Sequence, residues 1–459
     1  MTSSEEKVGL AVHSSEEGNL YDVERLRTLI SDCLCAWGAT DAQSPFSDIV
    51  SPGMSVLLKP NWVHDQNVSG LGNDCLVTHP NLILAALQEV LKAKPSRVII
   101  ADAPIQQCDF SALVPSDLRL RIKDLADLTG CPVEVIDLRR TILRKGGYVA
   151  GQDLEVRGDD RYILFDLGKE SLLDPVSTPD SRFRITCYHP DLLSLHHRPG
   201  KHEYFVAKEP FEADVVINMP KLKAHKKAGL TGAMKNLVGI NGNKEFLPHH
   251  RLGGSASGGD CYAGWSLIKR MIERCYDEAN RGIGTPQCAK WLKRSGQLQR
   301  VQNLIGNPEI EGGWHGNDTV WRMTLDLNRL LLYGRSDGTL SDTPLRKVYS
   351  LTDALIAGEG EGPLAPSPLV LGVLTFSDSS VFSDLVGASL MHFDYRKIPT
   401  VREAFGAFRY PLVTHAPEDC RVLFEGEEIT LHDVARWFGK DFHPSAGWRG
   451  HIEMTGDAE

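Results

Sequence analysis

The sequence lacks several motifs that would indicate a cofactor. No C-x-x-C pair occurs among the ten cysteines, so neither a zinc ribbon nor a ferredoxin-type iron–sulfur cluster is encoded locally. The cysteines lie far apart in a large chain, which is typical of reduced thiols. The chain also has no P-loop, G-x-x-x-x-G-K-[ST], and no G-x-G-x-x-G after its first strand-like run. Neither P-loop nor Rossmann nucleotide binding is therefore predicted, and the cofactor stays unknown.

Signals for secretion and for membrane insertion are also missing. The chain begins MTSSEEKVGL, with acidic residues where a signal peptide has basic ones, and no apolar run is long enough to span a bilayer. We therefore expect a cytoplasmic protein without a membrane partner. With 50 Lys and Arg against 60 Asp and Glu, the net charge of -10 also argues against nucleic acid as the main partner.

One basic stretch interrupts this acidic background. Residues 218–244, NMPKLKAHKKAGLTGAMKNLVGINGNK, contain six lysines, one histidine and no acidic residue. A charge run is usually a solvated loop, but this one follows an apolar run of strand type and contains several glycines. We therefore interpret it as part of a cleft that binds a small anion.

The hydrophobic pattern predicts an α/β fold. Up to residue 137, apolar runs of strand type alternate with stretches of helical periodicity. This alternation predicts a mainly parallel sheet with helices on both faces. Residues 138–210 contain short β-type runs separated by turn residues, which indicates an antiparallel β insertion. Residues 255–345 are polar with helical periodicity and predict a helical insertion.

These changes of pattern divide the chain into six predicted segments. They are a first α/β half (1–137), a β-rich insertion or cap (138–210), a second strand with the lysine-rich loop and a helix (211–254), a helical insertion (255–345), a closing α/β section (346–410) and a tail (411–459). Within the helical insertion, Asp326 and Arg329 lie three residues apart on the polar face of an amphipathic helix. We interpret them as a surface ion pair.

Three predicted loops follow the carboxyl ends of putative parallel strands, where ligands bind in open α/β sheets. One contains Lys59 and Asn61, the second begins at Asp102, and the third runs from residue 219 to 227. The third loop contains Lys221, Lys223, His225 and Lys226. All of these side chains are predicted to share one cleft.

Two helix starts are predicted to face the same cleft. Thr78 and His79 open one helix, and GLTGAMKNL opens the other. In the second, Gly232 allows close approach of the backbone and Thr231 supplies a hydroxyl, so its free N–H groups would form an anion cradle. Lys235 and Asn236 lie further along that helix.

A metal site is an alternative interpretation of the cleft, and the C-terminal section contains several carboxylates. His79, Asp102 and His225 would form a two-histidine, one-carboxylate set of the non-haem iron type, although nearby lysines oppose a divalent cation. The GEGEGP run predicts a turn, in which Glu359 would either pair with a cleft lysine or serve as an acid–base group. No role is assigned to Asp353, Asp378 or Asp384.

The lysine stretch resembles the family called domain of unknown function 362. The resemblance rests on PKLKAH followed by TGAMKN, with VLLKPNWV, THP, IADAP, DALIAGEGEGP and SDSSVFSDLVGASLM in the same order. It implies a loose link to redox chemistry, and some members carry iron–sulfur segments whose clustered cysteines this chain lacks. It also implies site roles for Lys59, Asn61, Thr78, His79, Asp102, Lys221, Lys223, His225, Thr231, Gly232, Lys235 and Asn236.

We expect an enzyme that binds a carboxylate- or phosphate-bearing small molecule and performs Lys and His acid–base chemistry. The predicted catalytic residues are His79, His225, Lys223 and Asp102. The predicted substrate-binding residues are Lys59, Asn61, Thr78, Lys221, Lys226, Thr231, Gly232, Lys235 and Asn236. A metal-dependent oxidoreductase and a non-catalytic binding module are the alternatives, and the sequence does not indicate an oligomeric state.

Overall fold

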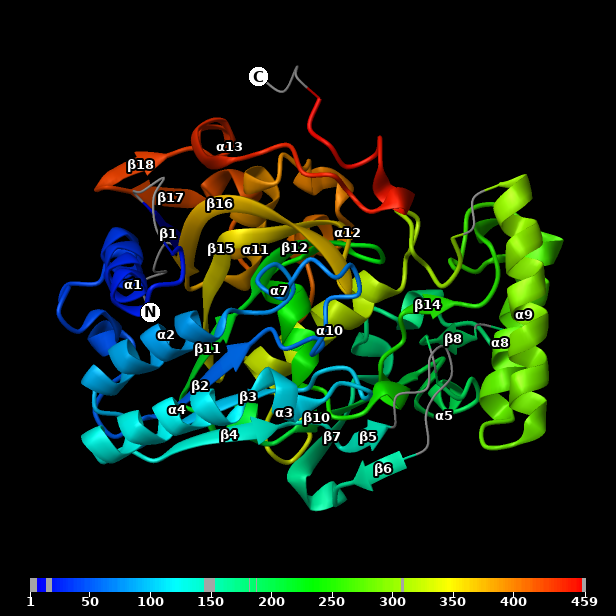
Figure 1. Ribbon diagram of the computed structural model, residues 1–459, viewed down its shortest axis with the longest axis horizontal. Helices are drawn as coiled ribbons and strands as arrows, with labels where there is room; N and C mark the ends of the chain where they lie inside the picture. The colour runs from blue at the N-terminus through cyan, green and yellow to red at the C-terminus, as the bar shows by residue number, and fades with distance from the viewer. Residues whose placement is uncertain are drawn as a thin grey trace.

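The computed structural model describes residues 6–13, 19–143, 153–180, 182–186, 188–306 and 309–455. Its centre is an eleven-stranded sheet (Figure 1). Nine strands follow the order β18-β17-β1-β16-β15-β11-β2-β3-β4, and β12 and β13 extend from β15. The strands are β1 (Lys7–Val12), β2 (Ser55–Pro60), β3 (Arg97–Asp102), β4 (Val133–Asp137), β11 (Val215–Met219), β12 (Lys221–His225), β13 (Gly229–Thr231), β15 (Lys347–Glu361), β16 (Ala365–Ser377), β17 (Arg421–Phe424) and β18 (Glu427–Ile429).

The middle of the sheet is parallel, as predicted. β15, β11, β2, β3 and β4 pair side by side in parallel. Residues of β2 and β11 are buried throughout, which explains their continuous apolar runs. The long β15–β16 pair and the β1–β16 pair are antiparallel. The mixed α/β fold is thereby confirmed.

Helices cover both faces of the sheet (Figure 1). On one face, α1 (Val23–Trp37), α2 (Pro80–Lys92) and α4 (Ser116–Thr129) bury their apolar stripes against β2 and β3. On the other, α10 (Val320–Tyr333) and α11 (Ser380–Leu390) pack in two further apolar clusters. The shorter helices are α3 (Phe110–Leu113), α5 (Leu193–His196), α6 (Glu209–Glu212), α7 (Ala233–Asn236), α12 (Pro399–Arg402) and α13 (Leu431–Phe438).

The predicted β insertion consists of small antiparallel sheets. β7 (Tyr162–Asp166), β10 (Lys201–Ala207) and β9 (His197–Arg198) form one. β5 (Thr141–Leu143) pairs with β6 (Asp153–Val156), and β8 (Phe183–Arg184) pairs with β14 (His250–Arg251).

The interpretation of Asp326 as one half of a surface ion pair is wrong. Its carboxylate is fully buried and accepts hydrogen bonds from the Tyr204 hydroxyl at 3.0 Å, from Leu172 N at 3.0 Å and from Ser171 Oγ. Arg329 is also buried and donates to the same carboxylate at 3.0 Å. The helical period predicted the spacing but not the insertion that covers this face of α10.

The helical insertion has two parts with different surroundings. α8 (Leu267–Arg281) and α9 (Pro286–Ile305) form a hairpin at the right of Figure 1, whereas α10 packs in the core beside the sheet. The tail contributes the short helix α13, which the helical pattern of LHDVARWFG indicates, and the edge strands β17 and β18, which the sequence did not predict. No helix in the described part of the chain is long and apolar enough to cross a membrane.

The lysine-rich stretch is not the long loop that we predicted. Lys221–His225 forms β12, which pairs in parallel with β15, and Gly229–Thr231 forms β13 antiparallel to it. Alternate side chains of a strand point to opposite faces. A regular strand would therefore place Lys221 and Lys223 on the same face, but the pairing of β12 with β15 shifts register between them, and the two lysines have different partners.

Candidate functional site

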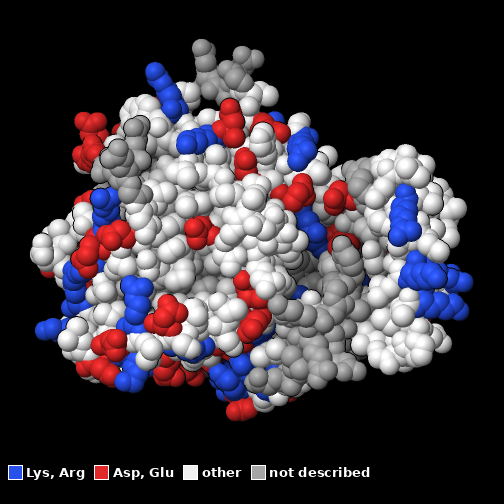
Figure 2. Space-filling view, viewed as in Figure 1, with Lys and Arg blue, Asp and Glu red and all other residues white. Residues whose placement is uncertain are grey.

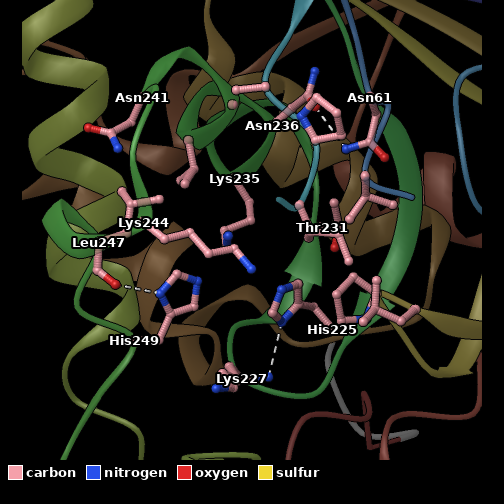
Figure 3. Close-up of a pocket in the computed structure, with 18 of the residues that line it drawn as sticks. Asn61, His225, Lys227, Thr231, Lys235, Asn236, Asn241, Lys244, Leu247 and His249 are labelled. Carbon is pink, nitrogen blue, oxygen red and sulfur yellow. Dashed lines mark hydrogen bonds between the residues drawn. The ribbon is translucent and has the colours of Figure 1, made fainter. Parts of the chain in front are cut away.

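A cavity of about 230 Å³ lies at the carboxyl ends of β2 and β3, beside β12 and β13 (Figure 3). Five lysines and two histidines line it, and among the described lining residues Asp102 is the only carboxylate. Its polar lining consists of Asn61, Asp102, Gln106, Thr186, Lys223, His225, Lys226, Lys227, Thr231, Lys235, Asn236, Asn241, Lys244 and His249. Valine, leucine, isoleucine and proline side chains complete the wall, so the cavity is both cationic and apolar.

Lys223, on β12, is fully buried, and no carboxylate in the described part of the chain pairs with it. Its ammonium donates to Asn61 Oδ1 at 2.9 Å and to the Leu76 carbonyl. Burial, followed by the charge of Lys221, lowers the pKa of Lys223 to about 7. Near neutral pH this amine is therefore divided between its charged and neutral forms. Its two hydrogen bonds leave the third position on nitrogen without a partner among the described residues.

A chain of amides fixes the group that Lys223 contacts. Asn61 Nδ2 donates to Asn236 Oδ1 at 2.8 Å, and Asn236 Nδ2 donates to Asn218 Oδ1 at 2.7 Å. Asn218 Nδ2 in turn donates to the Ala233 carbonyl at 2.9 Å. Because each amide nitrogen has an acceptor, the oxygen of Asn61 is directed toward Lys223. Asn61 and Asn236, both predicted site residues, thus position the lysine.

Lys235 offers a charge that no other described side chain neutralises. No hydrogen bond or ion pair holds its ammonium in the described part of the chain, and burial, then Lys227 and Lys59, lowers its pKa to about 8. Figure 3 shows Lys235 and Lys244 extending toward the space between His225 and His249. The hydroxyl of Thr231, in the same cavity, is buried without a hydrogen-bond partner. Lys235 and Thr231 thus provide donors for an anion that no other described residue uses.

The two histidines present different atoms to the cavity. His225 Nδ1 accepts from the backbone N–H groups of Lys227 at 3.0 Å and Ala228 at 3.2 Å, which assigns the proton to Nε2. His249 Nδ1 lies 2.8 Å from the Leu247 carbonyl, so its proton is assigned to Nδ1. Burial, followed by Lys235, holds the pKa of both rings well below the usual value. One neutral ring therefore offers a donor and the other an acceptor.

Asp102 lines the cavity but already has partners. One oxygen accepts from the buried ammonium of Lys59 at 2.6 Å and the other from Trp62 N at 2.7 Å. Gly239 allows this arrangement, since a Cβ there would lie 2.1 Å from the carboxylate oxygen. Burial raises the pKa of Asp102 and lowers that of Lys59, while their contact opposes both shifts. Lys59 anchors Asp102 and does not itself line the cavity.

Three further predicted residues also lie outside the cavity lining. Lys221 and Asp353 form a fully buried ion pair at 2.6 Å, and the Tyr21 hydroxyl donates to Asp353 at 2.9 Å. His79 stacks on the Tyr21 ring with 3.7 Å between centroids. Thr78 Oγ1 donates to the Met219 carbonyl at 2.6 Å, joining α2 to β11. These contacts connect elements of the fold rather than contacting a ligand in this cavity.

The predicted anion cradle at Gly232 is filled by the protein itself. Asp384, on α11, accepts from Ala233 N and from Met234 N, the latter at 3.1 Å. A Cβ on Gly232 would lie 2.0 Å from the same carboxylate. The N–H groups at the helix start are therefore used by the Asp384 carboxyl group, whose pKa burial raises to about 7, and are not free for an external anion.

The structure does not assemble the predicted metal site. In the described part of the chain, the only group of three candidate ligands within 4.8 Å of one another is His64, Asp65 and Cys108. His225 binds backbone N–H groups, His79 stacks on Tyr21, and Asp102 pairs with Lys59. The set of His79, Asp102 and His225 is thus wrong as a common ligand shell.

Glu359, Glu361 and Asp378 accept hydrogen bonds from backbone N–H groups of residues near the two ends of the chain. Glu359 accepts from His443 N at 2.9 Å and Glu361 from Ala446 N at 2.8 Å, so neither pairs with a cleft lysine. Both lie within β15, and the predicted turn begins only after it. Asp378 accepts from Lys7 N at 3.0 Å.

Sequence reasoning missed several lining residues. Lys227, Lys244 and His249 belong to or follow the basic stretch, and their proximity to it was the available signal. Ile185 and Thr186 come from the β insertion, and no motif in the sequence indicated that this insertion would form one wall of the site.

Comparison with known proteins supports the family resemblance. Residues 186–389 match the family model described as Domain of unknown function (DUF362). That range includes β12, β13 and most of the lysines and histidines of the cavity, whereas Asn61 and Asp102 lie before it.

Two individual proteins are also similar. A thylakoid-associated protein of Synechocystis sp. is 31% identical over 127 residues, which span 28% of this chain and 38% of the relative. A crystal structure of a Thermotoga maritima protein covers 79% of this chain and 57% of its own, with 10% identity and a TM-score of 0.31. At that TM-score the second similarity carries no conclusion.

Proposed function

We propose that this chain, whose residues 186–389 form a DUF362 domain, is an enzyme that binds a small anion and transfers a proton with a neutral lysine. The observation that carries the proposal is the cationic cavity. Five lysines surround it, and its only described carboxylate is already held by Lys59. The buried ammonium of Lys235 has no ion-pair partner among the described residues, and an unpaired buried charge is costly to maintain, so a ligand of opposite charge is the expected partner.

The lining indicates the chemical class of the ligand. Lys235, which has no partner among the described residues, and the unbonded hydroxyl of Thr231 suit a carboxylate or phosphate group. The apolar wall, which includes Val63, Ile105 and Leu247, suits a hydrocarbon body. A volume of about 230 Å³ limits the ligand to a small molecule.

Lys223 is the proposed general base. Its two N–H donors are used by Asn61 and Leu76, so its neutral form would leave the lone pair available at the position that the third hydrogen occupies in the charged form. A pKa of about 7 lies in the range where a base is both deprotonated and effective near neutral pH.

The reaction class that suits this arrangement is proton abstraction beside a carboxylate or carbonyl group. His225, as the Nε2–H tautomer, would donate a hydrogen bond to the oxygen on which negative charge develops, and Lys235 would supply positive charge. His249 Nε2 would be an acceptor for a substrate hydroxyl.

A titration with sulfate and with citrate tests the binding site. Replacing Lys235 with Met removes the free ammonium and keeps a similar length, so we expect affinity to fall about tenfold or more, as for loss of a charge-assisted hydrogen bond. Lys123→Met, which removes a surface lysine paired with Asp127, is the matched control. Equal affinity in the two variants would refute the assignment of the cavity.

The cytoplasmic location expected from the sequence remains a prediction. The Synechocystis relative is thylakoid-associated by its name, and the aligned region covers only part of either chain. Cell fractionation of the tagged full chain would distinguish a free aqueous protein from one recovered with membranes.

A further inference from the structure

The hairpin of α8 and α9 exposes a surface that the proposed function does not use. It lies beside the body of the molecule at the right of Figure 1, and α9 buries only Ser295 and Gln302. Six exposed apolar side chains occur where the start of α8 meets the end of α9. They are Trp265, Leu267, Met271, Val301, Leu304 and Ile305.

The same hairpin is basic on its outer side. α9 has four basic residues and no acidic one, in a chain whose net charge is -10. At 100° per residue its outward face carries Lys290, Lys293, Arg294, Arg300, Val301 and Leu304 in sequence. Figure 2 shows blue and no red over the front of this lobe. Basic and apolar side chains thus share one face about 30 Å long.

The acidic residues of α8 do not neutralise this face. Glu273 is buried, Asp277 pairs with Arg184 at 2.9 Å, and Glu278 pairs with Arg281 at 3.0 Å. The exposed bases Arg270 and Arg274 add to the positive surface. The hairpin therefore combines positive charge, which attracts anions at a distance, with exposed apolar side chains at one end, which water solvates poorly.

We propose that the α8–α9 hairpin docks the protein on the surface of an anionic phospholipid bilayer. Basic residues would lie near the lipid phosphates, while Leu304 and Ile305 enter the boundary between headgroups and acyl chains. Nucleic acid would satisfy the charges but not the exposed apolar side chains. A symmetric dimer formed through the hairpin would bury the apolar side chains but would place two basic faces against each other. This peripheral contact needs no spanning helix and is independent of the anion-binding cavity.

Co-sedimentation of the full chain with vesicles tests the proposal. We expect binding to vesicles of phosphatidylcholine with 30% phosphatidylglycerol, little binding to pure phosphatidylcholine, and release in about 0.5 M salt as charges are screened. Lys293→Ala combined with Arg300→Ala should weaken partition about 25-fold, from about fivefold for each basic residue near an anionic surface.

A matched pair of leucines provides the control. Leu304 is 87% exposed on α9, and Leu128 is 83% exposed on α4. Leu304→Asp should reduce vesicle binding more than tenfold and Leu128→Asp should not, while both variants keep wild-type sulfate affinity in the cavity. Equal effects of the two substitutions, or no binding to anionic vesicles, would overturn the proposal. So would duplex DNA binding that Leu304→Asp leaves intact, or a dimer that it abolishes without any vesicle binding.

Discussion

The buried amine of Lys223 gives a quantitative prediction about stability. Its pKa is lowered from 10.5 to about 7, mainly by burial. Since the folded-state pKa lies below the unfolded value, the unfolded chain binds more protons between these two pH values, and stability rises with pH across that window. Integrating this linkage from pH 6 to pH 9 gives a gain of about 3 kcal/mol from this one group.

Replacing Lys223 with Met should remove that gain. The absolute stability of the variant also changes, because Asn61 Oδ1 and the Leu76 carbonyl lose their donor. The informative quantity is therefore the difference in unfolding free energy between wild type and variant at several pH values. Urea denaturation followed by tryptophan fluorescence should show wild type gaining about 3 kcal/mol relative to the variant between pH 6 and pH 9. A difference that stays constant with pH would show that Lys223 has an ordinary pKa, and would refute its role as a base.

Three further predictions concern ion binding and buried carboxylates. Sulfate keeps its charge near neutral pH, so the pH dependence of its binding reports on the protein. Its affinity should fall as the pH rises through about 8, because Lys235 loses its proton there. In calorimetry, Lys235→Met should bind sulfate more weakly than wild type and with a flatter pH dependence. Asp353→Asn leaves the buried charge of Lys221 unpaired and should lower the free energy of unfolding, measured with urea, by about 3 kcal/mol. Combining Lys221→Met with Asp353→Leu should recover most of this loss. A loss below about 1 kcal/mol in Asp353→Asn would contradict the buried pair. Gly232→Ala places a Cβ 2.0 Å from the Asp384 carboxylate and should destabilise the protein by about 2 kcal/mol, whereas an unchanged melting temperature would contradict this packing.

Local pattern predicted the sheet because its physical cause is local. The apolar runs of β2 and β11 reflect burial on both faces, which any parallel strand between two layers of helices requires. The same argument correctly placed Asn61, Asp102 and Lys223 at one edge of the sheet. Strand ends converge regardless of their separation in sequence.

Long-range partners were not predictable in the same way. Lys221 and Lys223 are two residues apart on β12, yet one meets Asp353 and the other the cavity, because β12 has a register irregularity beside β15 between these residues. The N–H groups at the start of α7, which the sequence indicated as free for an external anion, donate to Asp384, about 150 residues further along the chain. His249 lacked a motif, although its position just after the basic stretch was a usable signal.

The most direct test of the central claim is to locate a bound oxyanion. A crystal of the full chain soaked in tungstate, measured for anomalous scattering, should show a peak in the cavity within hydrogen-bond distance, about 3 Å between donor and oxygen, of Lys235. The same peak should be lost in Lys235→Met and retained in Lys123→Met. Tungstate found only at the protein surface, with none in this cavity, would contradict the assignment of an anion site.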